Sequence, residues 1–354
     1  MRNVVLTKHG GPEVLQVQER PDPTLGVGEV RLQVAAAGVN FADVMARVGF
    51  YPDAPKPPCV LGYEVAGTVI ELGEGAAEAG LVVGQRVVAG TMFGGYASEV
   101  VVPVGDVVAL PDGLSFEQGA AIPVAYATAW AALIGYGNLQ RGERVLIHAA
   151  AGGVGTAATQ IARRHGAEVY GTASPSKHER IRELGVQHPL EYADVEAAGR
   201  GAKRGGAGEG GGANGAPGDG LPRFDLIMDA LGGRSLRRSY ELLRPGGRLV
   251  AFGASGAVSG ERRNLIAGLK TIVGMPRFNL VGQMSSSKAV IGLNMLSLWK
   301  DRGTLGPWIE PLSELLADGT IAPVVAEAFA FDRAGEAHRM IAERRNVGKV
   351  VLVP

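Results

Sequence analysis

The chain has 354 residues, and because Lys plus Arg and Asp plus Glu each total 35, its formal net charge is zero. A balanced charge gives no support for nucleic acid or an anionic membrane as a partner. The length predicts two domains, since a single hydrophobic core rarely grows beyond ~250 to 300 residues.

The first part of the chain, from Val4 to about Pro123, consists of short β-rich pieces separated by Gly and Pro, among them EVRLQVAAAGVN and EVAGTVIELG. This pattern predicts an irregular β-barrel. The N-terminus, MRNVVLTKHG, lacks the apolar core of a secretion signal, and no run of ~18 uncharged apolar residues occurs. We therefore expect no transmembrane segment and a soluble, cytoplasmic protein.

Cys59 is the only cysteine, which excludes an intrachain disulfide and a metal site made of several cysteines. We expect it to be a small buried apolar residue; the alternative is a reactive nucleophile. The six histidines are scattered singly, so each is interpreted as a surface or packing residue and not as a metal ligand.

From Tyr126 onward, strands alternate with helical stretches. RVLIHAA is a short apolar run typical of a buried parallel strand, and a helical spacing of apolar residues follows from Val154 to His165. Further strands are predicted in AEVYGTA, FDLIMDAL and GGRLVAFGA, with helices near 177–184 and 235–243. This alternation predicts an α/β fold with a doubly wound parallel sheet.

Residues 197–220, AAGRGAKRGGAGEGGGANGAPGDG, hold eleven glycines in 24 positions. Such a stretch cannot bury enough apolar surface to order itself, so we predict a disordered surface loop inserted into the second domain. The last stretch, IAPVVAEAFAFDRAGEAHRMIAERRNVGKVVLVP, predicts strand, helix and strand. Its β-rich end indicates that the chain returns to the first domain.

The segment HAAAGGVGTAA contains a dinucleotide-binding fingerprint with Ala150, Gly152 and Gly155 at its three key positions. The fingerprint requires a tight turn, a close backbone approach to the pyrophosphate and close packing of helix on strand. Ala in the first position can still turn if its φ stays negative. A predicted strand precedes the motif and a helix follows, so the helix N-terminus would face a phosphate, which predicts nucleotide binding.

The second strand of an NAD site usually ends with Asp or Glu, which binds the ribose 2′-hydroxyl. Here the strand ends in GTAS, at residues 171–174, and Lys177 follows. A pocket with an ammonium and a hydroxyl but no carboxylate favours a 2′-phosphate, so we expect NADPH rather than NADH. The alternative is that Lys177 only covers the start of the next helix.

Nearly the whole chain resembles the medium-chain dehydrogenase/reductase superfamily, specifically its zinc-free quinone oxidoreductases of zeta-crystallin type and their vesicle amine transport protein homologue branch. The resemblance rests on segments that include GVNFADVMARVGFYP, GYEVAGTV, AAGGVGTAA, GTASPSKHE and RNVGKVVLVP. It implies a GroES-like β-barrel catalytic domain from residues 1–124 and 299–354, around a Rossmann domain at 125–298. The cofactor, NADPH, would lie in the cleft between them.

The resemblance also implies that no metal is bound. Zinc alcohol dehydrogenases of this superfamily hold a catalytic zinc with Cys, His and Cys, whereas the matching positions here are Asn40 for the first Cys and Tyr63 for the His. One isolated Cys cannot supply the thiolate or imidazole ligands of a tetrahedral zinc. Without a metal to polarise an alcohol, reduction of an electrophilic acceptor is the feasible chemistry.

By the family match, Asn40, Asp43 and Tyr51 are the catalytic residues beside the nicotinamide. Asn40 is expected to hydrogen-bond a carbonyl or a ribose hydroxyl, and Tyr51 either donates to a developing oxyanion or is an ordinary aromatic at the rim. Asp43 either lines the pocket or is a buried acid that pairs with a cation or backbone amides. The implied cofactor contacts are Thr128, Gly152, Gly153, Val154, Ser174, Lys177, Tyr192, Phe252, Gly253 and Ser255. For Phe252, a role as the last core residue of its strand is the alternative.

We therefore expect a zinc-independent, NADPH-dependent oxidoreductase that transfers a hydride to a quinone or a similar carbonyl acceptor. Two alternatives stay open: an alkenal or enone double-bond reductase, and a lipid-handling or membrane-peripheral protein with little catalysis. The latter depends on the apolar stretch at 264–284, NLIAGLKTIVGMPRFNLVGQM. KAVIGLN, residues 288–294, matches the strand that pairs across the dimer in the superfamily, so a homodimer is expected.

Overall fold

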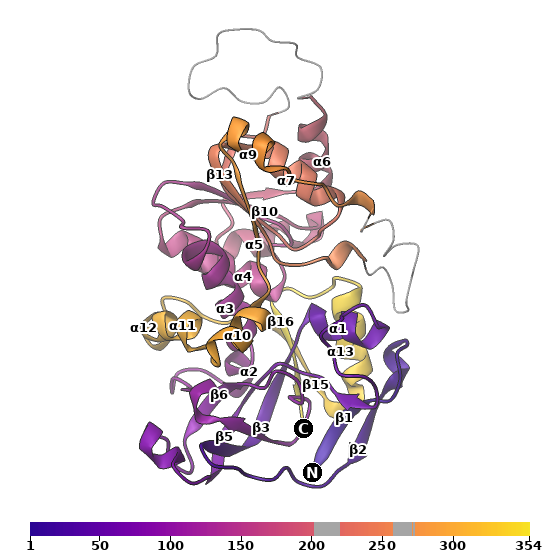
Figure 1. Cartoon of the computed structure of the whole chain (residues 1–354), viewed down its shortest axis with the longest axis vertical. Helices are drawn as coiled ribbons and strands as arrows, with labels where there is room; N and C mark the ends of the chain where they lie inside the picture. Colours follow the sequence, from indigo (N-terminus) through magenta and orange to yellow (C-terminus); the bar gives the residue numbers. More distant parts are fainter. Residues whose placement is uncertain (202–219, 258–270, 272) are drawn as a thin grey trace.

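The computed structural model describes residues 1–201, 220–257, 271 and 273–354, and they form two parts stacked along the long axis of the molecule (Figure 1). Each part is built on its own β-sheet, and both ends of the chain lie in the lower part. The chain crosses into the upper part in its middle section and then returns.

The lower part contains two sheets. A small antiparallel sheet consists of β1 (Arg2–Leu6), β2 (Leu15–Glu19) and β4 (Cys59–Val60). A seven-stranded sheet has the order β15-β16-β3-β5-β6-β8, with β7 paired to β3. Its strands are β3 (Glu29–Val39), β5 (Glu64–Leu72), β6 (Arg86–Gly90), β7 (Glu99–Pro103), β8 (Val107–Ala109), β15 (Val325–Ala330) and β16 (Lys349–Val353).

The C-terminal strand β16 returns the chain to the lower part, because its apolar run KVVLV is buried in all but the last residue. β16 pairs antiparallel with β3, where Val351 lies opposite Gly38, and parallel with β15. Helix α13 (Ala334–Ala342) connects β15 to β16 and contacts α1 (Phe41–Val48). The predicted strand, helix and strand at the C-terminus are therefore confirmed.

The upper part is a parallel sheet of six strands in the order β11-β10-β9-β12-β13-β14, which confirms the predicted doubly wound α/β fold. Every residue of β12 is buried, as expected for a central strand covered on both faces. The strands are β9 (Arg144–Ile147), β10 (Glu168–Thr172), β11 (His188–Leu190), β12 (Phe224–Asp229), β13 (Leu243–Ala251) and β14 (Ala289–Gly292). We propose the division at residues 124 and 298 for the two domains.

Helices surround this sheet and fill the space between the two parts (Figure 1). Those of the central section are α2 (Phe116–Gly119), α3 (Pro123–Trp130), α4 (Gly153–Arg164), α5 (His178–Glu183), α6 (Tyr192–Gly201), α7 (Arg234–Leu242) and α9 (Leu280–Ser286). After β14 follow α10 (Met295–Arg302), α11 (Gly306–Ile309) and α12 (Ser313–Ala317), of which α10 and α11 contact α3.

Two predicted segments differ in extent from the structure. The loop predicted at 197–220 begins too early, because α6 continues to Gly201, and residues 202–219 lie outside the described residues. The apolar stretch at 264–284 is described only at residue 271 and from 273 onward, where its end forms α9. Within the described part of the chain, no helix is both long and apolar enough to cross a membrane.

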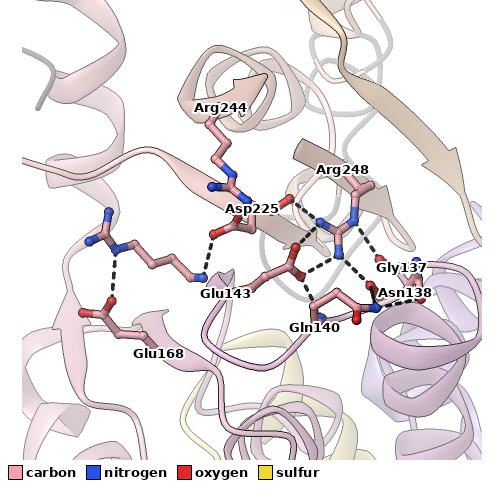
Figure 2. Close-up of polar contacts among 9 residues, drawn as sticks. Gly137, Asn138, Gln140, Glu143, Glu168, Asp225, Arg244 and Arg248 are labelled. Atoms are coloured by element: carbon pink, nitrogen blue, oxygen red, sulfur yellow. Dashed lines mark hydrogen bonds and ion pairs between the residues drawn. The ribbon is translucent and has the colours of Figure 1, made fainter. Parts of the chain in front are cut away.

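A network of charged side chains joins the loop before β9 to the amino ends of the parallel strands (Figure 2). The Arg248 guanidinium donates to both carboxylate oxygens of Glu143, at 2.8 and 2.7 Å, and to the carbonyl of Gly137 at 2.7 Å. Burial acts to raise the pKa of Glu143, but the hydrogen bonds from Arg248 outweigh it, so the net shift is downward. This network stabilises the edge where the strands begin and leaves the opposite edge for a ligand.

Candidate functional site

The loop after β9 has the geometry of a phosphate-binding turn. Gly152 precedes the first turn of α4, whose N-terminal backbone amides are directed into the cleft. A Cβ on Gly155 would lie 2.4 Å from the carbonyl oxygen of Ala149, so only glycine lets the helix pack this closely on the turn. The left-handed residue of the turn is Ala149, with a φ of 55°, and not Ala150, the position that the fingerprint predicts for the tight turn.

Two adjoining cavities open at this edge of the parallel sheet. The first has a volume of about 500 Å³ and is lined by the phosphate-binding turn, and the second, of about 690 Å³, is lined largely by apolar residues. They form one continuous cleft between the two parts of the molecule, because they share wall residues from both. The shared residues are Asn40, Phe41, Val154, Ala230, Phe252 and Ser255.

All ten predicted cofactor residues lie on this cleft. Phe252 and Ser255 are at the junction of the two cavities, and Thr128 and Gly253 line the second one. Phe252 directly follows β13 and is half-buried, so it both packs on the core and faces the cleft. The others line the first cavity and are Gly152, Gly153, Val154, Ser174, Lys177 and Tyr192.

Lys177 lies at the far end of the first cavity, where its ammonium is held by the C-terminal part of the chain. Its Nζ donates to the carbonyl oxygens of Arg344 and Asn346 at 2.5 and 2.7 Å, and burial lowers its pKa. Arg344 lines the same cavity, so two cations from different parts of the molecule meet here. Sequence reasoning missed Arg344, although RNVGKVVLVP was among the family segments.

Asn40 is fixed at the junction of the cavities through its side-chain amide. Its Nδ2 donates to Glu64 Oε1 at 2.8 Å, and its Oδ1 accepts from Lys349 Nζ at 2.6 Å. Lys349 and Glu64 also form a buried ion pair, and the other carboxylate oxygen of Glu64 accepts from the backbone nitrogen of Val124 at 2.7 Å. Sequence reasoning missed Glu64 and Lys349, since nothing local links the starts of β5 and β16.

Asp43 is fully buried in α1 and does not line either cavity. Its carboxylate accepts from the backbone nitrogens of Asn40 at 2.8 Å and Gly62 at 3.0 Å. Burial raises the pKa of Asp43 to about 6, although these two hydrogen bonds act in the opposite direction. The geometry therefore favours the second of our two interpretations, a buried acid that serves backbone amides.

Tyr51 and Tyr63 form part of the wall of the second cavity. Their rings meet edge to face, with centroids 6.4 Å apart and an interplanar angle of 79°. Burial raises the pKa of both hydroxyl groups, so both remain neutral hydrogen-bond donors at physiological pH. Met45 lies on the same wall.

His148 is the one histidine among the residues that line the first cavity. It is buried, and its ring nitrogens lie 3.2 Å from Thr172 Oγ1 and 3.1 Å from Ser239 Oγ, while burial lowers its pKa. It therefore acts as a neutral packing residue behind the turn. Among the described residues, no three His, Cys, Asp or Glu side chains are grouped to hold a metal ion.

The arrangement of a GroES-like domain on a nucleotide-binding parallel sheet defines a medium-chain dehydrogenase/reductase, and the chain belongs to that superfamily. Family profiles match residues 26–112, as an alcohol dehydrogenase GroES-like domain, and residues 214–352, as a zinc-binding dehydrogenase. The zinc in that description belongs to the family at large, because Asn40 and Tyr63 stand here where zinc ligands are expected.

Within the superfamily, the chain belongs to the zinc-free branch of the VAT-1 homologues. It is 36% identical over 358 residues to the human synaptic vesicle membrane protein VAT-1 homolog, covering 100% of this chain and 86% of the relative. The quinone oxidoreductase from Thermus thermophilus, whose structure with NADPH is also solved, is 32% identical over 100% of both chains, with a TM-score of 0.76. The CurK enoyl reductase structure is 27% identical, covers 99% of this chain and 98% of that one, and has a TM-score of 0.80.

Proposed function

We propose that the protein is an NADPH-dependent, metal-independent reductase that transfers a hydride to quinones or similar electrophilic carbonyl acceptors. The observation that carries the proposal is the continuous cleft, which has a phosphate-binding turn at one end and an apolar chamber with neutral hydroxyl donors at the other. Quinones are flat and apolar with two carbonyl oxygens, which suits such a chamber.

The residues of the first cavity fit NADPH. The space above Gly155 is closed to a side chain but open to a pyrophosphate, and Lys177 with Ser174 provides the charge and hydroxyl for a 2′-phosphate. When bound, NADPH supplies a hydride from the nicotinamide ring. The chain's own residues bind the cofactor, exclude water and orient the acceptor, with Asn40 held between Lys349 and Glu64 to direct its amide at the junction.

The test is the initial rate of NADPH and NADH oxidation by purified, chelator-treated protein, with an ortho-quinone, a para-quinone and an alkenal as separate acceptors. We expect turnover with NADPH and a quinone, and much slower turnover with NADH. Tight NADPH binding without turnover of any acceptor would contradict the proposal. Loss of turnover after chelation would contradict the metal-independent part of it.

A second candidate is an enone or alkenal double-bond reductase, which the likeness to the CurK enoyl reductase favours. The same hydride and the same cleft would serve both reactions. Product analysis separates them, because quinone reduction yields a hydroquinone whereas enone reduction yields a saturated carbonyl compound.

We further propose a homodimer that pairs through β14, which is the edge strand of the parallel sheet. Of the described strands, only β13 pairs with it, so its other edge has free backbone donors and acceptors. Light scattering after size-exclusion chromatography would give twice the mass of the chain, and a monomer mass at high concentration would contradict the dimer. A cytoplasmic location stays a prediction from the sequence.

A further inference from the structure

Tyr63 carries a buried hydroxyl that has no hydrogen-bond partner among the described residues. Only 5% of the residue is exposed, yet it forms part of the wall of the second cavity, beside Tyr51 and Phe93. An unsatisfied buried hydroxyl costs about 1 to 3 kcal/mol, so a chain is not expected to keep one without a use. The adjoining cavity can supply the missing acceptor atom.

The backbone around Tyr63 is held rigidly. Gly62 has a φ of 96°, and a Cβ there would lie 2.6 Å from the Tyr96 ring, so glycine is required. The Gly62 nitrogen donates to Asp43, and the Tyr63 carbonyl accepts from the Thr91 nitrogen at 2.9 Å. The phenol is therefore a pre-positioned donor, as stabilisation of a developing charge requires.

The charge around Tyr63 keeps its proton in place. Burial raises the pKa of the hydroxyl far above its ordinary value, and the negative charge of Asp43 adds to that effect. The phenol is thus a poor acid but a good neutral donor. Such a group can bind an oxyanion without transferring its proton to it.

We propose that Tyr63 is a further catalytic residue, whose hydroxyl, together with that of Tyr51, binds the carbonyl oxygen of the acceptor and stabilises the negative charge that develops there. The inference rests on the proposed hydride transfer, since charge develops on the oxygen only when a hydride arrives. Tyr63 stands where zinc enzymes of the superfamily have a histidine ligand, so a hydrogen bond takes the place of the metal–oxygen contact.

The step balances as a two-electron reduction. A hydride, with its electron pair, leaves NADPH, which is oxidised to NADP⁺, and forms a new bond to the acceptor, whose carbonyl π electrons move onto oxygen. The oxyanion accepts hydrogen bonds from the two phenols. One proton from water then completes the hydroquinone, or the saturated carbonyl compound where the acceptor is an enone.

The test is Tyr63→Phe, which removes the hydroxyl and keeps the ring. We expect kcat/KM for the quinone to fall about 10²-fold, with the Kd of NADPH and the Tm unchanged. The matched control is Tyr126→Phe, because the Tyr126 hydroxyl is equally buried but bonds to Gln160 at 3.1 Å and does not line either cavity. Unchanged kcat/KM in Tyr63→Phe, or an equal loss in both variants, would overturn the proposal.

A binding measurement separates this inference from the proposed function. 4-Nitrophenolate mimics the anionic product of hydride transfer and can be titrated into the NADP⁺ complex by calorimetry. We expect Tyr63→Phe to weaken its binding at least about tenfold, as loss of one hydrogen bond to a charged group predicts. If the native protein reduces no acceptor but shows this loss, the proposed function fails and the oxyanion site stands. Equal binding by both proteins overturns the oxyanion site whether or not a quinone is reduced.

Discussion

The ammonium of Lys349 lies 2.6 Å from the side-chain oxygen of Asn40, although the two residues are 309 positions apart in the chain. Lys349 begins the last strand, and Asn40 directly follows β3, with which that strand pairs. Docking of the C-terminal strand therefore sets the orientation of an amide at the junction of the two cavities. Glu64, which is fully buried, completes the contact.

Removal of one member of this ion pair should cost more than removal of both. Lys349→Met leaves Glu64 as an unpaired buried charge, so we expect a loss of about 3 to 5 kcal/mol in the free energy of unfolding, and Glu64→Gln should also be destabilising. The double variant should lose clearly less than the sum of the two single losses. Urea unfolding of all four proteins measures this, and strictly additive losses would show that the pair does not act as a unit.

Lys177 should distinguish NADPH from NADH. Its ammonium is oriented by the carbonyls of Arg344 and Asn346, which leaves a donor for a 2′-phosphate. We expect Lys177→Ala to weaken NADPH at least about tenfold more than NADH, and fluorescence titration measures both affinities. Lys288→Ala is the control, because Lys288 is also half-buried but bonds to the Tyr240 carbonyl away from the cleft. Equal losses for both cofactors would contradict the assignment.

Local patterns in the sequence were sufficient for the fold. The apolar runs of β9 and β12 and the glycines before α4 predict a nucleotide-binding parallel sheet, and the structure contains it. Contacts between distant segments could not be predicted in this way. The pairing of Lys349 with Glu64 depends on how β16 docks, and the single family segment GYEVAGTV contains both Tyr63 and Glu64 without indicating that one faces a cavity and the other an ion pair.

Asp43 should make the activity depend on pH. Because its pKa is raised to about 6, its carboxylate is ionised above pH 6 and accepts from the backbones of Asn40 and Gly62. Protonation weakens these hydrogen bonds, so we expect kcat to fall below about pH 6 at saturating NADPH. Asp43→Asn is neutral at every pH and should lack this acidic limb. If the limb persists in Asp43→Asn, another group is responsible, such as the cofactor phosphate, which also titrates near pH ~6.

The stability contribution of Asp43 should change in the opposite direction. A folded-state pKa above the ordinary value of 3.8 means that the folded protein binds the proton more tightly than the unfolded chain does. The stability that follows is fully present below pH 3.8 and is lost as the pH rises through about 6. In urea unfolding, the native protein should therefore lose stability relative to Asp43→Asn as the pH rises from about 4 to above about 6. A difference that does not vary with pH would contradict the shift.

Arg248 should matter for stability and not for catalysis. It holds Glu143 and the carbonyl of Gly137 at the edge of the sheet opposite the cleft (Figure 2). Arg248→Met leaves a largely buried carboxylate unpaired, so we expect a loss of about 3 kcal/mol with kcat unchanged in the folded enzyme. The exposed pair of Arg180 with Glu183 is the control, and Arg180→Met should cost less than about 1 kcal/mol. Similar losses in the two variants would contradict the prediction.

The exposed apolar side chains of α9 should be part of the dimer contact and not of a lipid contact. Leu280, Val281 and Met284 are each about 70% exposed, do not line either cavity, and precede the edge strand β14 by only a few residues. We therefore expect Leu280→Ser with Met284→Ser to raise the dimer Kd at least about tenfold, since each leucine-sized side chain contributes about 1.5 to 3 kcal/mol on burial. Analytical ultracentrifugation measures the Kd, and phosphatidylserine-containing vesicles should not co-sediment with the native protein. Co-sedimentation that the double variant abolishes, with the mass of the free protein unchanged, would support the lipid alternative instead.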